Sequence, residues 1–223
     1  MSDELKVTGM VLSAVPSGEY DKRIVLLTKE RGKISAFARG ARKPNSRLLA
    51  PCTPFSFGTF SVYEGRSAYT VVNGEITNYF QELKADFEGT CYGIYFMEVA
   101  DYFSRENLDA SGLLNLLYAS LRALMNPHLE RELVRSIFEM KAMVLDGEYP
   151  YEVTEDPSLQ ESTRYALSYV LQVPIQKLYT FTLKPEIQKE FQQVQKRMMK
   201  RIVGKEFKSM EVLRTMLSTG VQV

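Results

Sequence analysis

Histidine and cysteine, two of the side chains that ligate zinc, are scarce in this chain. It contains one histidine, His128, and two cysteines, Cys52 and Cys91, which lie far apart in the sequence. A single histidine excludes a multi-histidine metal site, and two separated cysteines support neither a disulfide framework nor a thiolate cluster. We therefore expect no metal and no cofactor, with both thiols in the core.

Long apolar runs and targeting signals are missing as well. The segment Met1–Lys6 lacks a basic region followed by an apolar stretch, and no run elsewhere is long enough to span a bilayer. Hydrophobic residues nevertheless make up 45% of the chain, which is enough for a buried core. We expect a folded cytoplasmic protein with no membrane partner.

The residue patterns of common enzyme active sites are absent too. No glycine-rich loop ends in GKS or GKT. Glu139-Met140-Lys141 resembles the acid and lysine pair of a nuclease, but it lies in a helical pattern, where adjacent side chains diverge. His128 follows a proline near a predicted helix start, which favours a structural role. The sequence therefore predicts a protein that is not an enzyme.

Basic residues are segregated along the chain, although the total of 28 basic and 27 acidic residues is nearly balanced. Residues 1–80 carry 11 basic and 7 acidic side chains, residues 81–150 carry 6 and 12, and residues 151–223 carry 11 and 8. Between positions 22 and 47 only Glu30 opposes a series of cations: Lys22, Arg23, Lys29, Arg31, Lys33, Arg39, Arg42, Lys43 and Arg47. Such a cluster favours a phosphate backbone as partner. A solvated charged surface is the alternative.

Strand signals fill the first 80 residues. Short runs of β-branched and aromatic residues alternate with glycine, proline, asparagine and serine, which is typical of a small barrel. Gly32 is expected at a positive φ in a tight turn. We predict five strands, at about Lys6–Val15, Arg23–Thr28, Lys33–Ala38, Phe55–Tyr63 and Tyr69–Ile76. This is the size of an OB-type barrel, which binds oligonucleotides across its second and third strands.

One aromatic residue is predicted to stack on a base. On the third strand Ile34, Ala36 and Ala38 alternate with polar residues and Phe37, so that Phe37 falls on the polar face. Base stacking on an exposed aromatic ring stabilises single-stranded complexes by about 1–3 kcal/mol per base. Core packing is the alternative for each aromatic of this region, including Tyr20, Phe57 and Tyr63.

Helical periodicity replaces the strand pattern after residue 80. A linker-like segment at 147–157 interrupts it. The predicted domains are therefore an OB-fold domain at 1–80 and an all-α helical domain at 81–223, an α+β two-domain fold. We predict helices at Asp86–Ser104, Leu113–Met125, Leu129–Leu145, Ser158–Leu171, Pro174–Tyr179, Pro185–Val203 and Ser209–Leu217.

Several segments resemble the RecO family of bacterial DNA repair and recombination mediators. The resemblance is strongest at Gly32–Arg47, which contains the stretch RGARKPNSR. It covers essentially the whole chain, through Val7–Leu12, Asp21–Thr28, Pro54–Phe55, Leu145–Pro150, Ala166–Leu171, Lys177–Phe181 and Gly204–Ser209. Many members carry a four-cysteine zinc module after the segment that resembles Tyr149-Pro150. This chain has no cysteine there, so the zinc module is not expected.

The resemblance implies a non-catalytic DNA-binding mediator of the RecF pathway. Such a protein binds single- and double-stranded DNA, anneals complementary strands, associates with RecR and with the C-terminal tail of single-strand-binding protein, and helps load RecA in the bacterial nucleoid. Arg39, Arg42 and Lys43 are the foremost phosphate contacts, because they match the family motif and flank Gly40, expected as a flexible hinge. The expected DNA-binding residues are Lys22, Arg23, Lys33, Phe37, Arg39, Arg42, Lys43 and Arg47.

A second basic run lies on the last long predicted helix. Helical spacing places its four cations on one side, beside the apolar residues Val194, Met198 and Ile202. An acidic, apolar peptide such as the tail of single-strand-binding protein suits such a surface, and a solvated helix face is the alternative. The cations expected to bind this tail are Lys196, Arg197, Lys200 and Arg201.

A different class of function also fits a basic barrel. An OB fold does not by itself distinguish DNA from RNA, so an OB-containing RNA-binding or translation-associated protein is the alternative to the mediator. Competition between DNA and RNA strands of equal length separates the two hypotheses.

Overall fold

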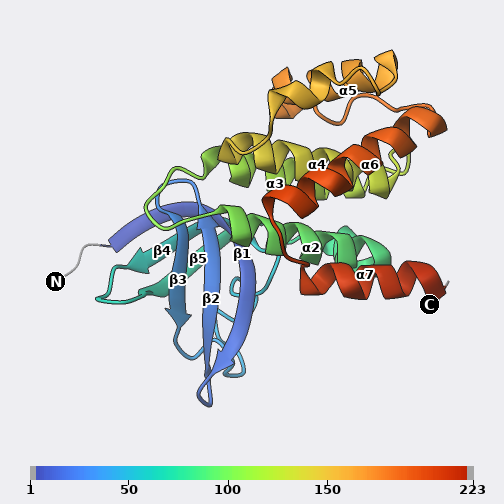
Figure 1. The fold of residues 1–223 in the computed structure, drawn as a ribbon. Helices are drawn as coiled ribbons and strands as arrows, with labels where there is room; N and C mark the ends of the chain where they lie inside the picture. The colour runs from blue at the N-terminus through green and yellow to red at the C-terminus, as the bar shows by residue number, and fades with distance from the viewer. Residues whose placement is uncertain (1–3, 220–223) are drawn as a thin grey trace. The chain divides into compact units, whose positions relative to one another are not determined.

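A computed structural model describes residues 4–219 of the chain, with side chains up to residue 215 (Figure 1). Its contacts form two compact units. We call residues 1–81 with 100–114 the barrel unit, and residues 82–99 with 115–223 the helical unit. The boundary passes through three helices, at residues 81–82, 99–100 and 114–115, so each of these helices contributes residues to both units.

The barrel unit contains a closed five-stranded barrel, which confirms the predicted OB-type fold. The strand order is β1-β2-β3-β5-β4, and β1 pairs with β4 to close it. All pairs are antiparallel except β3 with β5, which is parallel over two residues. The strands are β1 (Glu4–Ser17), β2 (Asp21–Thr28), β3 (Gly32–Ala38), β4 (Phe57–Tyr63) and β5 (Tyr69–Asn78).

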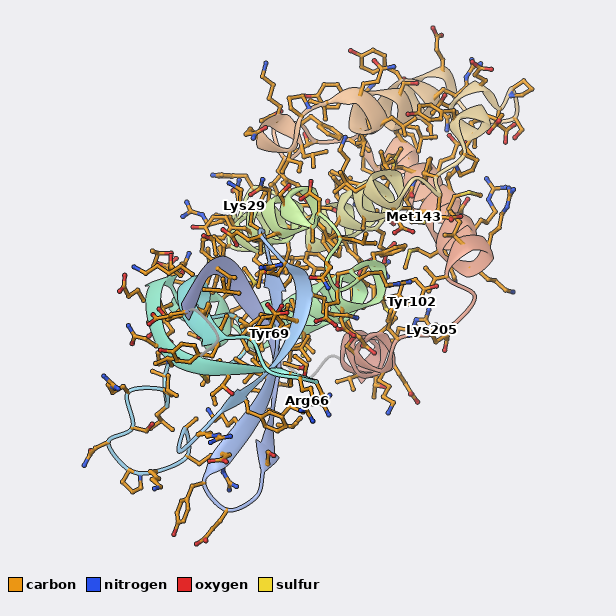
Figure 2. All side chains as sticks on the ribbon, turned by 90° about the vertical axis from the view of Figure 1, so that its left-hand side faces the viewer. Lys29, Arg66, Tyr69, Tyr102, Met143 and Lys205 are labelled. Carbon is orange, nitrogen blue, oxygen red and sulfur yellow. The ribbon has the colours of Figure 1, made fainter. Side chains whose placement is uncertain are left out.

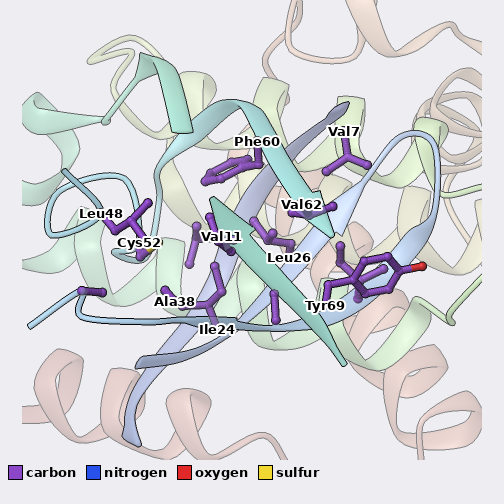
Figure 3. Packing of buried hydrophobic residues seen from close by; sticks show 14 residues of the cluster. Val7, Val11, Ile24, Leu26, Ala38, Leu48, Cys52, Phe60, Val62 and Tyr69 are labelled. Carbon is purple, nitrogen blue, oxygen red and sulfur yellow. The ribbon is translucent and has the colours of Figure 1, made fainter. Parts of the chain in front are cut away.

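The barrel interior follows the period of two that the sequence predicts. Ile34, Ala36 and Ala38 of β3 are fully buried, while Phe37 between them is 36% exposed. Apolar residues from all five strands meet them inside the barrel (Figure 3). The larger members of this cluster are Val7, Val11, Ile24, Leu26, Phe60, Val62, Tyr69 and Val71.

The connection between β3 and β4 closes one end of this core. Ala41, Leu48 and Cys52 are buried and belong to the barrel cluster, as Figure 3 shows for Leu48 and Cys52. Burial raises the pKa of Cys52 to about 11, so its thiol stays protonated and packs as an apolar group, as expected. The basic residues of this connection therefore stand on a loop that is anchored at several points.

The turn between β2 and β3 is covered by a later segment of the barrel unit. Gly32 has the predicted positive φ, 64°, and forms a β-bridge with Glu106. The backbone N–H of Lys33 donates to the Arg105 carbonyl at 3.0 Å, and that of Asn107 donates to the Arg31 carbonyl at 3.0 Å. A Cβ atom on Gly32 would lie 2.3 Å from the Arg105 carbonyl oxygen, which leaves no room for a side chain.

The helical unit contains most of the predicted helices. Within the described residues, no helix is long and apolar enough to cross a membrane. One predicted helix is wrong, because Pro174–Tyr179 holds only a short 3-10 turn, η2 (Ile175–Lys177). The linker-like segment 147–157 contains a second such turn, η1 (Tyr151–Glu155). The helices of the chain are α1 (Gln81–Ala85), α2 (Phe87–Phe103), α3 (Ser111–Leu124), α4 (Arg131–Asp146), α5 (Glu161–Gln172), α6 (Pro185–Ile202) and α7 (Lys208–Thr219).

A buried lysine caps the end of α5, just before the fifth predicted helix, Pro174–Tyr179. The Lys141 ammonium of α4 donates to the carbonyls of Val170, Leu171 and Val173 at 3.1, 2.8 and 2.9 Å, where α5 ends. These contacts satisfy carbonyls that a helix end leaves open. They also direct Lys141 away from Glu139, whose carboxylate accepts a hydrogen bond from Tyr95 at 2.7 Å. The two charged groups therefore diverge, as the helical pattern predicts.

We expect Gly32→Ala to destabilise the protein more than Gly18→Ala. Both glycines have φ near +65°, so both substitutions place a side chain in the left-handed region, at a cost of about 1–2 kcal/mol. Only Gly32 adds a clash with backbone, because nothing lies within 4 Å of the Cβ position of Gly18. Urea unfolding should show a loss of at least about 3 kcal/mol for Gly32→Ala. Equal losses for the two variants would contradict the packing of this turn.

Candidate nucleic-acid interface and peptide groove

Three neighbouring strands place a mixed apolar and basic row on the outside of the barrel. Val15 of β1 pairs with Arg23 of β2, and Arg23 pairs with Phe37 of β3. Val15 is 54% exposed and Phe37 36% exposed, while the Arg23 guanidinium donates from Nε to the Ser35 hydroxyl at 3.0 Å. Phe37, the predicted stacking residue, therefore lies beside Arg23, whose guanidinium is held in place by Ser35.

The loop after β3 continues this surface with exposed cations. Arg39, Arg42, Lys43 and Arg47 are all exposed. Gly40, expected as a flexible hinge, is instead held in a turn with φ 66°, because its N–H donates to the Asp21 carboxylate at 2.7 Å. In Figure 2, where Lys29 marks the β2–β3 turn, the loops at the other end of the barrel carry side chains that project outward.

The β1–β2 turn fixes two of these loop cations. The Arg42 guanidinium donates to the Gly18 carbonyl at 3.2 Å, and its backbone N–H donates to the Tyr20 carbonyl at 2.8 Å. The Lys43 ammonium lies 5.4 Å from the centre of the Tyr20 ring, within range of a cation–π contact. Tyr20 is 43% exposed and thus joins Phe37 as an aromatic residue available on this surface.

Two of the expected phosphate contacts, Lys22 and Lys33, bind other parts of the protein. The Lys22 ammonium donates to the carbonyls of Leu49 and Cys52 at 3.2 and 2.9 Å, and burial lowers its pKa. The Lys33 ammonium lies 3.2 Å from the Asp101 carboxylate and donates to the Asp101 carbonyl at 2.7 Å. Lys22 thus holds the β3–β4 connection and Lys33 holds the last part of α2 within the barrel unit. The exposed surface that remains consists of Arg23, Phe37, Arg39, Arg42, Lys43 and Arg47. We call this set the basic barrel face.

The helical unit contains a groove of about 600 Å³ that is lined by both apolar and charged side chains. Figure 2 labels Lys205, one of its lining residues, in the connection between α6 and α7. We call this pocket the apolar groove. Its apolar lining consists of Tyr95, Met199, Phe207, Met210 and Leu213, and its basic lining consists of Arg135, Lys196, Lys200, Lys205 and Arg214.

Two carboxylates give the apolar groove its shape. Glu98 accepts hydrogen bonds from the backbone of Lys208 and from Ser209, and so anchors the start of α7. Burial acts to raise the pKa of Glu98, but the bonds from Ser209 and Lys208, together with the charge of Lys205, hold that pKa below its ordinary value. Arg135 lies between Glu132 and the buried Glu139. Burial raises the pKa of Glu139, and the charge of Arg135 opposes that rise.

The four cations expected to bind a peptide differ in position. All are exposed on α6. Lys196 and Lys200 line the apolar groove, whereas Arg197 lines only a neighbouring hollow, and Arg201 lines neither. Val194 and Met198, the apolar residues expected beside these cations, are buried in the helical unit. Among the described residues, no group of three or more His, Cys, Asp and Glu side chains is placed to hold a metal ion.

Family models match both parts of the chain. The model described as Recombination protein O N terminal matches residues 1–80, and the model described as Recombination protein O C terminal matches residues 84–153. The chain belongs to the RecO family. The two RecO models together span the barrel and the helices up to η1, so the cations of α6 lie outside the matched region.

Individual relatives support the same assignment. A "DNA repair protein RecO" of Alkaliphilus metalliredigens is 36% identical over 66% of this chain, and one of Bacillus subtilis is 34% identical over 65%. These matches span 60% and 56% of the two relatives. A RecO protein of Acetivibrio thermocellus is 25% identical over 95% of the chain and 97% of its own length. Similarity to RecO proteins thus extends beyond the segment that the family models match.

We expect Lys22→Met to destabilise the barrel unit. The substitution keeps an unbranched side chain but leaves the carbonyls of Leu49 and Cys52 without their donor, which should cost about 1–3 kcal/mol. Arg47→Met is the matched control, because Arg47 is exposed, and it should change stability by less than about 0.5 kcal/mol. Urea unfolding of both variants tests the difference. Equal stabilities would show that the Lys22 contacts hold nothing in place.

Proposed function

We propose that this protein is a non-catalytic, DNA-binding recombination mediator of the RecF pathway. The observation that supports it best is the basic barrel face: four exposed cations on an anchored loop, next to a strand row that carries Arg23 and a half-exposed Phe37. Relatives named DNA repair protein RecO support a role in repair. The basic barrel face is the site at which we place the DNA backbone.

The chemistry of this face suits binding without sequence readout. Cations that neutralise phosphates release counterions, and this electrostatic contribution is the same for every sequence. Exposed aromatic rings at Phe37 and Tyr20 add stacking that tolerates any base. Such a surface can bind single-stranded DNA through both phosphates and bases, and double-stranded DNA through its phosphates alone. Bringing two strands together then needs neutralised charge and no bond making or breaking, which is how we propose that the protein anneals complementary strands.

Protein partners complete the proposed role. We place the acidic, apolar C-terminal tail of single-strand-binding protein in the apolar groove, where Lys196, Lys200 and Lys205 lie beside an apolar lining. Membership of the RecO family supports association with RecR and help in loading RecA onto coated strands as parts of this proposal. In this proposal the protein works in the cytoplasm at the nucleoid, where DNA and these partners meet.

Joint substitution of Arg39, Arg42 and Lys43 by Gln should weaken binding of single-stranded DNA and flatten its salt dependence. Each phosphate contact contributes about 0.7 to the slope of log affinity against log salt, so three contacts should remove about 2. Fluorescence anisotropy of a labelled 20-nucleotide strand across a salt series measures this slope. The matched control replaces three exposed cations of the helical unit, Lys177, Lys184 and Lys189, by Gln.

If the triple variant of Arg39, Arg42 and Lys43 is folded and its salt slope is unchanged, DNA does not bind at the basic barrel face. Equal loss of slope in the control variant would show that net charge, and not this face, determines the affinity. Competition with an RNA strand of the same length tests the proposed substrate, because stronger binding of RNA would favour an RNA-binding protein over a DNA mediator.

Met199→Glu should abolish binding of a peptide that ends in an apolar residue after an acidic run. Met199 lines the apolar groove and is only half-buried, so a carboxylate there repels the peptide without disturbing the core. Gln172→Glu on α5 adds the same charge at an exposed position and should leave the affinity unchanged. Anisotropy of the labelled peptide gives both affinities. Undiminished binding by Met199→Glu would place the peptide elsewhere.

A further inference from the structure

The segment that joins α4 to α5 is acidic and contains no cation. Six carboxylates and no lysine or arginine lie between Lys141 and Arg164. None of the six forms an ion pair within the described residues. They are Asp146, Glu148, Glu152, Glu155, Asp156 and Glu161. This region therefore carries negative charge that the helical unit does not neutralise.

The two most exposed large hydrophobic side chains of the described residues lie in the same region. Tyr151 of η1 is 68% exposed, and Tyr165 of α5 is 73% exposed. Glu152 and Glu155, three residues apart, share one side of the 3-10 turn, and Glu161 lies one helical turn before Tyr165. Because η1 packs against α5, the two elements form one surface on the outside of the helical unit, beyond α4 and α6 (Figure 1). We call these five residues the acidic aromatic surface.

The chemistry of the acidic aromatic surface favours a protein partner that carries cations. Tyrosine is enriched at the centres of protein interfaces, and charged residues are found at their rims. The carboxylates repel phosphates, which excludes nucleic acid as the ligand of this surface. A partner must offer cations to the carboxylates, and cations or apolar groups to the two rings.

The basic barrel face of the same chain offers these groups. Four exposed cations of the loop after β3 lie beside a strand row in which Val15 is 54% exposed and Phe37 is 36% exposed. One of these cations already contacts a tyrosine, because the Lys43 ammonium lies 5.4 Å from the centre of the Tyr20 ring. A second copy of this chain therefore has the cations and the apolar groups that the acidic aromatic surface requires.

We propose that the acidic aromatic surface of one copy binds the basic barrel face of a second copy, and that DNA competes with this contact. The contact joins two different surfaces, so a pair of copies leaves one surface of each kind uncovered for further copies. Cations that a neighbouring copy covers cannot reach phosphates, and DNA that occupies them releases the neighbour. Self-association thus keeps the basic barrel face covered until DNA is present. The competition rests on the DNA site proposed above.

Sedimentation velocity of the full chain over a concentration series tests the contact. At about 0.1 M salt the sedimentation coefficient should rise with protein concentration. At about 1 M salt the rise should disappear, because the Debye length falls from about 10 Å to about 3 Å. An excess of a DNA strand of about 10 nucleotides, short enough for one OB domain, should convert the associated species into complexes of one protein per strand.

Charge reversal on either surface should separate the copies, and combining the reversals should rejoin them. The acid-reversed variant carries Glu152→Lys, Glu155→Lys and Glu161→Lys. The base-reversed variant carries Arg39→Glu, Arg42→Glu and Lys43→Glu. Each variant alone should self-associate at least about tenfold more weakly, because unlike charges become like charges. An equimolar mixture of the two should associate again, since every altered surface then meets an opposite charge.

A control variant separates this contact from an effect of net charge. It reverses three exposed carboxylates elsewhere in the helical unit, Glu82, Glu186 and Glu211, and should self-associate like the unaltered protein. Tyr165→Ala changes no charge and should weaken self-association about fivefold. The acid-reversed variant should bind DNA with undiminished affinity, which also shows that it is folded.

The outcomes separate this inference from the proposed function. If the unaltered protein sediments as a monomer at every concentration, or if the acid-reversed and control variants associate equally, the contact is overturned and the DNA site is unaffected. If the copies stay associated when DNA is bound, the competition is overturned. If the base-reversed variant loses self-association but binds DNA as tightly as the unaltered protein, the proposed DNA site fails and the competition fails with it, whereas the contact between copies stands.

Discussion

Closure of the barrel by β1 is the constraint on which the candidate DNA site depends. This strand of 14 residues pairs with β2 along one edge and with β4 along the other. A closed barrel has no free strand edge and its interior is filled by side chains, so a partner can reach only outward side chains and loops. The outer row of Val15, Arg23 and Phe37, together with the loop after β3, therefore forms the surface at which we propose that DNA binds.

Anchoring turns that loop into a defined surface. Leu48 and Cys52 are buried in the barrel core, the Lys22 ammonium bonds two loop carbonyls, and Asp21 holds the Gly40 turn. A flexible loop loses conformational entropy when a ligand orders it, whereas a loop that is already ordered in the free protein does not have this cost. The cations of Arg39–Arg47 are thus carried on a backbone that needs little reorganisation to meet phosphates.

Ionic contacts shape the helical unit in a similar way. Lys141 ends α5, Glu98 begins α7, and Arg135 lies between two carboxylates of α4. Each buried charge has partners, as the cost of burying an isolated charge requires. These contacts place α6 and α7 so that apolar and basic side chains line one groove, while the exposed cations of α6 remain directed to solvent.

Local patterns along the chain were sufficient to predict the five strands, most helices, the turn at Gly32 and the basic cluster. This is because a repeat of two or 3.6 residues, or a glycine at positive φ, depends only on residues that are neighbours in the sequence. The same patterns did not reveal which cations are exposed. Lys22 lies on the same face of its strand as the buried Ile24 and Leu26, and the sequence alone shows this alternation. The carbonyls that Lys22 bonds, however, lie 27 and 30 residues away in the sequence. Lys33 and Asp101 are 68 residues apart, and the residues that line the apolar groove come from four helices and the segment between α6 and α7. Such pairings are decided only when distant segments pack, because charge and spacing in a sequence carry no information about which partner a side chain meets.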